Sequence, residues 1–203
     1  MLIHLIRHGQ TDFNAQGRVQ GSIDTELNAV GIDQAEQLAR SCTIPIDVVI
    51  SSPMRRARHT ADILVAARQL PLETDSSFRE QRFGRLEGLT LAEIRVAHPQ
   101  FFTNDFLHEW RHAPPGGESL GELAVRVDAG LQRVRARHAG KSVALVAHGF
   151  VARLIQAMHR GRIDDFFDWR IDNGAIVTLD CSERYPAVVN LEHILSAAQT
   201  ESG

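Results

Sequence analysis

Two short apolar runs in this chain each lead into a histidine that is followed by glycine. The first run covers residues 2–6 and leads through an arginine into His8, and the second covers 142–147 and leads into His148. Runs of five or six mostly apolar residues are typical of strands buried on both faces of a sheet. Both histidines are therefore predicted to stand at the ends of core strands.

The rest of the pattern predicts an α/β fold. Apolar runs over 47–50 and 175–179 add two further strands. Between the strands, capping residues and apolar periodicity predict helices from Asn28 to about Arg40, from Ser52 and Pro53 to about Arg68, from Ser119 and Glu122 to about His138, and from Gly149 to about Met158. Strands that alternate with helices favour a three-layer αβα arrangement with a mostly parallel central sheet.

The length of the chain favours one domain. A chain of 203 residues with 43% hydrophobic content can bury one substantial core, so we expect a single domain over 1–203. Residues 81–118 differ from the rest and are predicted to form a small cap-like insertion. They end in a Pro-Pro-Gly-Gly breaker, and their aromatic residues are Phe83, Phe101, Phe102, Phe106 and Trp110.

Charge and cysteine content exclude several classes of partner. A net charge of -3 gives no overall field that would attract nucleic acid or an acidic membrane, so an anion site has to be local. Cys42 and Cys181 are too far apart in sequence to suggest a thiolate metal site or a disulfide framework. The first apolar stretch is too short for a signal sequence or a membrane span. A cytoplasmic location is expected.

No metal site is predicted from the histidines. His4 and His8 share an H-x-x-x-H spacing, but on a strand they would lie about 13 Å apart.

The strand ends carry groups suited to a phosphoryl anion. In open α/β sheets, ligands bind at the carboxyl ends of the strands, where helix N-termini also point. Arg7 and Arg56 could brace the equatorial oxygens of the phosphoryl group. Neighbouring positive charge would lower the pKa of His8 and keep it neutral as a nucleophile. By its position, Glu80 is the best available acid for the leaving group.

These residues also resemble a known family. Residues 7–14, RHGQTDFN, are similar to the R-H-G-[EQ]-[ST]-x-x-N signature of the histidine phosphatase superfamily, in its phosphoglycerate-mutase-like branch. Blocks similar to the family pattern follow in the same order over 17–35, 51–61 (SSPMRRARHTA), 78–88 (FREQRFGRLEG), 115–119 (PGGES) and 146–149 (VAHG). The resemblance covers nearly the whole chain.

The resemblance implies roles for the residues that match. His8 would carry the phosphoryl group as a phosphohistidine without a metal or any other cofactor, and Glu80 would donate the proton. The residues expected to bind the phosphoryl group are Arg7, Arg56 and His148, with Asn14 assisting. Further candidates for substrate binding are Gln20, Gly21 and Gly149, together with Arg82 and Arg111 in the cap-like insertion.

The expected activity is hydrolysis of a small phosphorylated metabolite, as a metal-independent phosphomonoesterase. The family's mutases, which use 2,3-bisphosphoglycerate, have a lysine that is missing from residues 86–91 and a second cap arginine where His112 follows Arg111. The chain is also shorter than typical mutases and is expected to lack their closing tail, so water should reach the phosphoenzyme more easily. A mutase, or a non-catalytic relative that binds a phosphorylated ligand, remains an alternative.

Within the phosphatase interpretation, α-ribazole phosphatases, sugar-phosphate phosphatases and broad-specificity enzymes all fit the blocks. No nucleic acid or membrane partner is expected, and a homodimer is left open.

Overall fold

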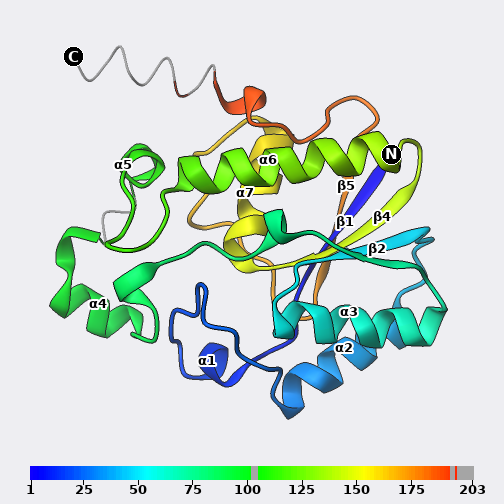
Figure 1. Cartoon of the computed structure of the whole chain (residues 1–203), viewed down its shortest axis with the longest axis horizontal. Coiled ribbons are helices and arrows are strands. Elements are labelled where there is room, and N and C mark those ends of the chain that lie inside the picture. Colours follow the sequence, from blue (N-terminus) through cyan, green and yellow to red (C-terminus); the bar gives the residue numbers. More distant parts are fainter. Residues whose placement is uncertain (102–104, 193–194, 196–203) are drawn as a thin grey trace.

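The computed structural model describes residues 1–101, 105–192 and 195, and its centre is a sheet of five strands (Figure 1). In spatial order the sheet is β3-β2-β4-β1-β5. The strands are β1 (Leu2–Arg7), β2 (Val48–Ser51), β3 (Leu72–Thr74), β4 (Ser142–Ala147) and β5 (Ile176–Asp180). The first four run parallel to their neighbours, and β5 runs antiparallel to β1 at the edge.

The register of β1 and β4 brings the two histidines together. Arg7 is the partner of Ala147, the last residue of β4. The next residue on each strand is therefore a histidine, and the backbone N–H of His8 donates to the carbonyl oxygen of Ala147 at 3.1 Å. His8 and His148 leave the sheet side by side at the carboxyl ends of parallel strands.

Two layers of helices cover the sheet (Figure 1). Residues of α6 (Leu120–Arg137) and α7 (Gly149–Arg160) pack in one core cluster with Leu5 and Leu145. On the opposite face, α2 (Ala29–Ser41) and α3 (Arg55–Arg68) pack in a second cluster with Ile6 and Val146. Adjacent strand residues point to opposite faces, so a fully apolar strand fills both cores. The predicted three-layer αβα fold with a mostly parallel sheet is confirmed.

The shorter elements lie near the ends of the strands. These are α1 (Asp12–Ala15), α4 (Leu91–Ala97) and α5 (Phe106–Arg111), together with 3₁₀ turns at Ser76–Phe78, Gly84–Leu86 and Pro99–Phe101. The segment 81–118 contains α4 and α5, and α5 packs against α6. Phe102, one of the aromatic residues expected in the cap-like insertion, lies outside the described residues.

One helix start was predicted wrongly. We expected Ser52 and Pro53 to open the third helix, but α3 begins at Arg55 and its cap residue is Met54. The carboxylate of Asp24 accepts from the backbone N–H of Arg55 at 2.8 Å and so takes the capping role from a distant part of the chain. In the described part of the chain, no helix is long and apolar enough to cross a membrane.

Candidate active site

A cavity of about 560 Å³ opens at the carboxyl ends of the strands and collects most of the predicted site residues. Those that line it are Arg7, His8, Asn14, Gln20, Gly21, Arg56, Glu80 and Gly149. His148 is fully buried behind this surface, with its ring centroid 5.2 Å from that of His8. Arg82 and Arg111 are not part of the lining, so the structure does not bring these two cap residues to the site.

The hydrogen bonding of His8 selects its tautomer. The Nδ1 atom lies 2.7 Å from the carbonyl oxygen of Gly9, and a carbonyl can only accept. We therefore assign the proton to Nδ1. The other nitrogen, Nε2, keeps its lone pair and has no hydrogen-bond partner among the described residues. A neutral imidazole with a free Nε2 in a cavity is equipped to act as a nucleophile.

Glycine after His8 lets this segment lie directly against α2. A Cβ atom at position 9 would fall 2.2 Å from the carbonyl oxygen of Gly31, in the first turn of α2. The backbone N–H of Gly9 also donates to the hydroxyl of Thr60 on α3 at 3.1 Å. His8 is therefore held at its backbone from both sides.

Burial and positive charge act together on His8. Loss of solvent lowers the pKa of His8 well below 6.5, and the guanidinium of Arg56 lowers it further. The carbonyl of Gly9 opposes this shift, and Arg7 adds a smaller contribution in the same direction as Arg56. The sequence predicted the direction from charge alone, whereas burial is the larger cause.

Ser52 sets the tautomer of His148. The backbone N–H of Met54 donates to the Ser52 hydroxyl at 3.3 Å, and this hydroxyl lies 2.8 Å from Nε2 of His148. We infer that the hydroxyl donates to Nε2, so that His148 carries its proton on Nδ1. That Nδ1 atom is buried and has no partner. Burial and the nearby Arg56 lower the pKa of His148 as they do for His8.

Arg56 is almost completely buried, with 1% of its surface exposed. Its two Nη atoms donate to the carbonyl oxygens of Ile23 at 2.8 Å and Gly21 at 3.0 Å. The Nε atom has no partner. Loss of solvent lowers the pKa of Arg56 to about 10, so it remains charged at neutral pH.

Arg7 has the same arrangement. One Nη atom donates to the carbonyl oxygen of Ile171 at 2.9 Å, and its buried Nε has no partner. Three unpaired buried donors therefore surround His8: Nε of Arg7, Nε of Arg56 and Nδ1 of His148. Each unsatisfied donor costs roughly 1–3 kcal/mol. The cluster is suited to a small ligand with several acceptor oxygens.

Two amide side chains present donors to the same cavity. Oδ1 of Asn14 accepts from the backbone N–H of Thr11 at 3.1 Å and from Nδ2 of Asn173 at 3.3 Å. Oε1 of Gln20 accepts from the hydroxyls of Thr11 at 2.9 Å and Thr25 at 2.5 Å. With both oxygens engaged, the NH₂ groups of Asn14 and Gln20 are left for a ligand.

Glu80 lies at the N-terminus of α7. Its carboxylate accepts from the backbone N–H groups of Phe150 at 3.2 Å and Gln81 at 3.1 Å, with a longer contact of 3.4 Å to that of Val151. A Cβ atom at Gly149 would lie 3.8 Å from Oε2 of Glu80 and 3.9 Å from Nε of Arg7. The carboxylate and the Arg7 guanidinium therefore flank the same glycine.

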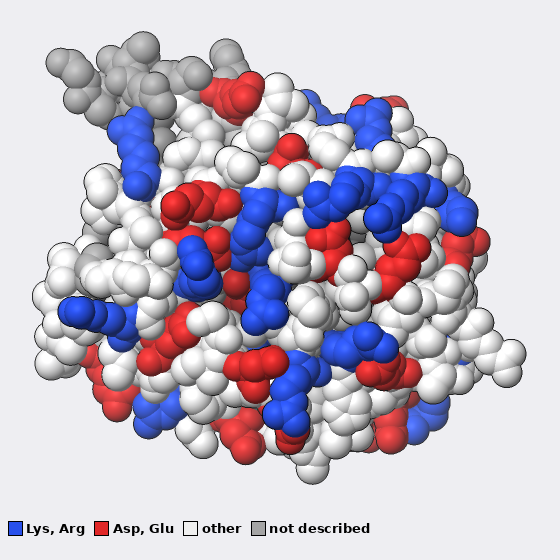
Figure 2. Space-filling view, viewed as in Figure 1, with Lys and Arg blue, Asp and Glu red and all other residues white. Residues whose placement is uncertain are grey.

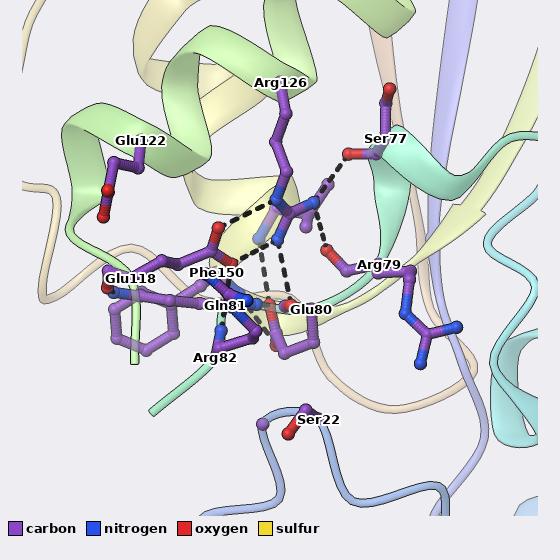
Figure 3. A network of polar contacts seen from close by, with 12 residues as sticks. Ser22, Ser77, Arg79, Glu80, Gln81, Arg82, Glu118, Glu122, Arg126 and Phe150 are labelled. Atoms are coloured by element: carbon purple, nitrogen blue, oxygen red, sulfur yellow. Dashed lines mark hydrogen bonds and ion pairs between the residues drawn. The ribbon is translucent and has the colours of Figure 1, made fainter. Parts of the chain in front are cut away.

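Arg126 braces the segment that carries Glu80 (Figure 3). From α6, its Nη atoms donate to the carbonyl oxygens of Ser77 at 2.7 Å, Arg79 at 2.7 Å and Glu80 at 2.9 Å. Its Nε and Nη2 atoms bind both oxygens of Glu118, at 3.0 Å and 2.6 Å. A planar guanidinium with five donors can hold three carbonyls and a carboxylate at once.

Sequence reasoning missed several residues of this site. Ser52 lies in the 51–61 block and Glu118 in the 115–119 block, and their place in these family-like blocks was the available signal. Arg126, Arg153 and Arg170 had no such signal, because only the fold brings Arg153 and Arg170 to the cavity and Arg126 to the backbone of Glu80.

The side chain of His4 contacts the neighbouring strands of the sheet. Its nitrogens lie 2.8 Å from the Thr178 hydroxyl and 2.7 Å from the Ser142 hydroxyl. Among the described residues, no group of three or more His, Cys, Asp or Glu side chains is placed to hold a metal ion.

Comparison with known proteins gives one consistent family. The model described as "Histidine phosphatase superfamily (branch 1)" matches residues 3–193. "Phosphoglycerate mutase-like protein 4" of Arabidopsis thaliana is 36% identical over 74% of this chain and 67% of its own length. "Metal-independent phosphoserine phosphatase" of the same plant is 35% identical over 75% of this chain and 66% of its own length.

Solved structures agree with the sequence matches. The "Alpha-ribazole Phosphatase from Shigella flexneri" superposes with a TM-score of 0.77 at 27% identity, covering 91% of this chain and 93% of that one.

Proposed function

The chain belongs to branch 1 of the histidine phosphatase superfamily and is a phosphomonoester hydrolase, and from that premise we propose that it hydrolyses small organic phosphates, without a metal, through a phosphohistidine on His8. The observation that carries this proposal is the convergence of three unpaired buried donors, from Arg7, Arg56 and His148, around the free Nε2 of His8. A phosphoryl group offers three equatorial oxygens to three such donors.

In the first step, Nε2 of His8 attacks phosphorus and the bond from phosphorus to the ester oxygen breaks. Arg7 and Arg56 neutralise charge on the equatorial oxygens, and Nδ1 of His148 donates a further hydrogen bond. The leaving alkoxide takes a proton from the protonated carboxyl group of Glu80. This group and the Arg7 guanidinium both lie next to Gly149.

In the second step, a water molecule gives a proton to Glu80 and attacks phosphorus. The bond from phosphorus to nitrogen breaks, which restores neutral His8 and releases inorganic phosphate. The acid of the first step is the base of the second, so the residues return to their starting protonation states.

The arginines take the place that metal ions occupy in many phosphoryl-transfer sites. The buried guanidinium of Arg56 and the partly buried one of Arg7 supply fixed positive charge at the position where negative charge develops. The similarity to the "Metal-independent phosphoserine phosphatase" of Arabidopsis thaliana supports the same assignment.

The segment 81–118 is proposed to act as the cap that contacts the remainder of the substrate. Phe83, Leu91 and Ile94 of this segment line the cavity, so an apolar wall faces the phosphoryl site. The roles of Arg82 and Arg111 in substrate choice stay predictions.

Turnover of p-nitrophenyl phosphate in the presence of EDTA tests the proposal. Wild-type protein should release phosphate at the same rate with and without the chelator, and His8→Ala should lose the activity. A rapid quench at alkaline pH, followed by peptide mapping, should place radioactive phosphorus on His8. Equal activity of wild type and His8→Ala would overturn the proposal and leave the non-catalytic alternative.

A mutase would be distinguished from a phosphatase by its product. Incubation with phosphoglycerate and the bisphosphorylated cofactor should yield inorganic phosphate faster than it yields the isomeric phosphoglycerate. The opposite order would identify a mutase, as the name of the mutase-like relative would suggest.

A further inference from the structure

The cavity holds more positive charge than one phosphate needs. Among the described residues it is lined by six arginines and three acidic residues, which gives a net charge of at least +3 in a chain whose net charge is -3. Basic and acidic side chains are interspersed over the face shown in Figure 2, so that face as a whole does not share the imbalance of the cavity. A phosphomonoester brings a charge of about -2 near neutral pH.

Part of the excess lies in the segment that joins α7 to β5. The carbonyl oxygen of Trp169 accepts from Nε of Arg153 at 2.8 Å, and that of Ile171 accepts from Arg7 at 2.9 Å. Arg170 lies between these two residues and lines the same cavity. One short segment therefore gathers three guanidiniums, one from the phosphoryl site and two outside it.

This segment is fixed to the phosphoryl site. Nδ2 of Asn173 donates to the carbonyl oxygen of His8 at 2.9 Å, and the backbone N–H of Gly174 donates to that of Arg7 at 3.0 Å. A ligand bound against Arg170 would therefore be held at a set distance from His8.

Arg153 is held so that one edge of its guanidinium stays available. Its Cζ atom lies 5.0 Å from the centre of the Phe150 ring, and Nε is used by Trp169. Neither Nη atom of Arg153 has a partner among the described residues, which leaves both for a carboxylate or phosphate.

Arg170 is exposed and makes no hydrogen bond or ion pair with any described residue. Its charge lowers the pKa of Arg153 and of Arg7, although burial is the larger cause for both. Asp168 beside it and Asp172 beyond it reduce the excess without forming an ion pair with it. Like charges kept together without a counter-ion are typical of an anion site.

We propose that Arg153 and Arg170 form a second anion subsite, which binds a carboxylate or a further phosphate on the same substrate. The inference rests on the proposed function, since the phosphoryl group has to occupy the site of Arg7, His8 and Arg56. It narrows the substrate class to small phosphomonoesters with a second anionic group a few bonds from the ester. The two groups are expected to lie close together, because Arg170 directly precedes Ile171, whose carbonyl oxygen binds Arg7.

Matched substrate pairs test this subsite. O-phosphoserine differs from O-phosphoethanolamine by a carboxylate, and ethylene glycol bisphosphate differs from the monophosphate by a phosphate. In one of the two pairs, wild-type protein should show a kcat/KM at least tenfold higher for the substrate that carries the second anionic group. The pair that shows the preference identifies whether the second group is a carboxylate or a phosphate.

Substitution of Arg170 tests whether this residue causes the preference for the second anionic group. Arg170→Gln should reduce the ratio of kcat/KM within that pair by about tenfold. Arg162→Gln is the matched control, because Arg162 is an exposed arginine that pairs with Asp164 and does not line the cavity. It should leave the ratio unchanged.

The outcomes separate the two proposals. If p-nitrophenyl phosphate is not hydrolysed in a His8-dependent manner, the proposed function fails. If it is hydrolysed but both pairs give ratios near one, or Arg170→Gln leaves the preferred ratio unchanged, the second subsite is wrong and the phosphatase assignment stands.

Discussion

The hydroxyl oxygen of Ser52 lies 2.8 Å from Nε2 of His148, and both side chains are fully buried. The serine directly follows β2 and the histidine directly follows β4, so two neighbouring parallel strands are needed to bring them together. Because the hydroxyl donates to Nε2, the proton of His148 is kept on Nδ1, which has no other partner. In the proposed mechanism, Ser52 therefore prepares His148 as a hydrogen-bond donor to a phosphoryl oxygen.

Ser52→Ala should reduce phosphatase activity without unfolding the protein. Nε2 of His148 would lose its donor and compete for the ring proton, so fewer molecules would present Nδ1–H. We expect kcat/KM for p-nitrophenyl phosphate to fall by roughly 10- to 100-fold. Ser51→Ala is the control, since the Ser51 hydroxyl donates to the backbone of Ser52 and does not contact His148. Equal losses in the two variants would contradict this role.

The sequence located the candidate catalytic residues better than the residues that position them. His8, Arg56 and His148 could be located because each follows a core strand within a few residues, and parallel strands end at one edge. The bond from Ser52 to His148 joins residues 96 positions apart, and nothing in either motif specifies it. Arg170 is an isolated arginine in sequence, and its place at the cavity depends on the path of the segment after α7.

The limits in predicting the fold have similar causes. The strand β3 (Leu72–Thr74) has three residues, too few for a periodic pattern, and it lies at the edge with no buried residue. The direction of β5 could not be predicted, because a short apolar run has the same residue pattern in a parallel strand and in an antiparallel strand. The start of α3 depends on Asp24, which is remote in sequence.

Glu80→Gln should affect substrates according to their leaving groups. The amide keeps the shape of the side chain but cannot transfer a proton in the first step. Hydrolysis of an alkyl phosphate should slow by roughly a hundred- to ten-thousandfold. Hydrolysis of p-nitrophenyl phosphate should slow much less, because nitrophenolate leaves without protonation. A loss of equal size for both substrates would show that Glu80 has another role.

Arg126→Gln should reproduce the selectivity of the Glu80 variant in weaker form. Arg126 binds the carbonyl oxygens of Ser77, Arg79 and Glu80, so its loss frees the backbone that positions the carboxylate. We expect the rate on an alkyl phosphate to fall about tenfold more than that on p-nitrophenyl phosphate. Steady-state kinetics with both substrates would measure the difference.

The control for this variant is Arg133→Gln on the same helix. Arg133 binds the carboxylate of Asp75 and the hydroxyl of Ser77, but it does not contact the backbone of Glu80. It should lower both rates equally or not at all. If Arg126→Gln also lowers both rates equally, Arg126 supports only the fold.

The buried histidines should make stability depend on pH. Burial lowers the pKa of both His8 and His148 well below 6.5, while in the unfolded chain they titrate near that value. As pH falls below 6.5, the unfolded state therefore binds more protons than the folded state, and acid destabilises the protein. The stabilisation is fully present above pH 6.5. Each histidine should contribute a slope of up to about 1.36 kcal/mol per pH unit.

Urea denaturation from pH 8 down to pH 5 would measure this slope. His148→Gln should be less stable at neutral pH, but its free energy of unfolding should fall less steeply in acid than that of wild type. His59→Gln, at an exposed position of α3, should keep the wild-type slope. Burial lowers the pKa of His4 as well, so part of the slope should remain in the His148 variant. An unchanged slope in His148→Gln would mean that both ring nitrogens carry protons in the folded protein, and Nε2 of His148 could not then accept a hydrogen bond from the Ser52 hydroxyl.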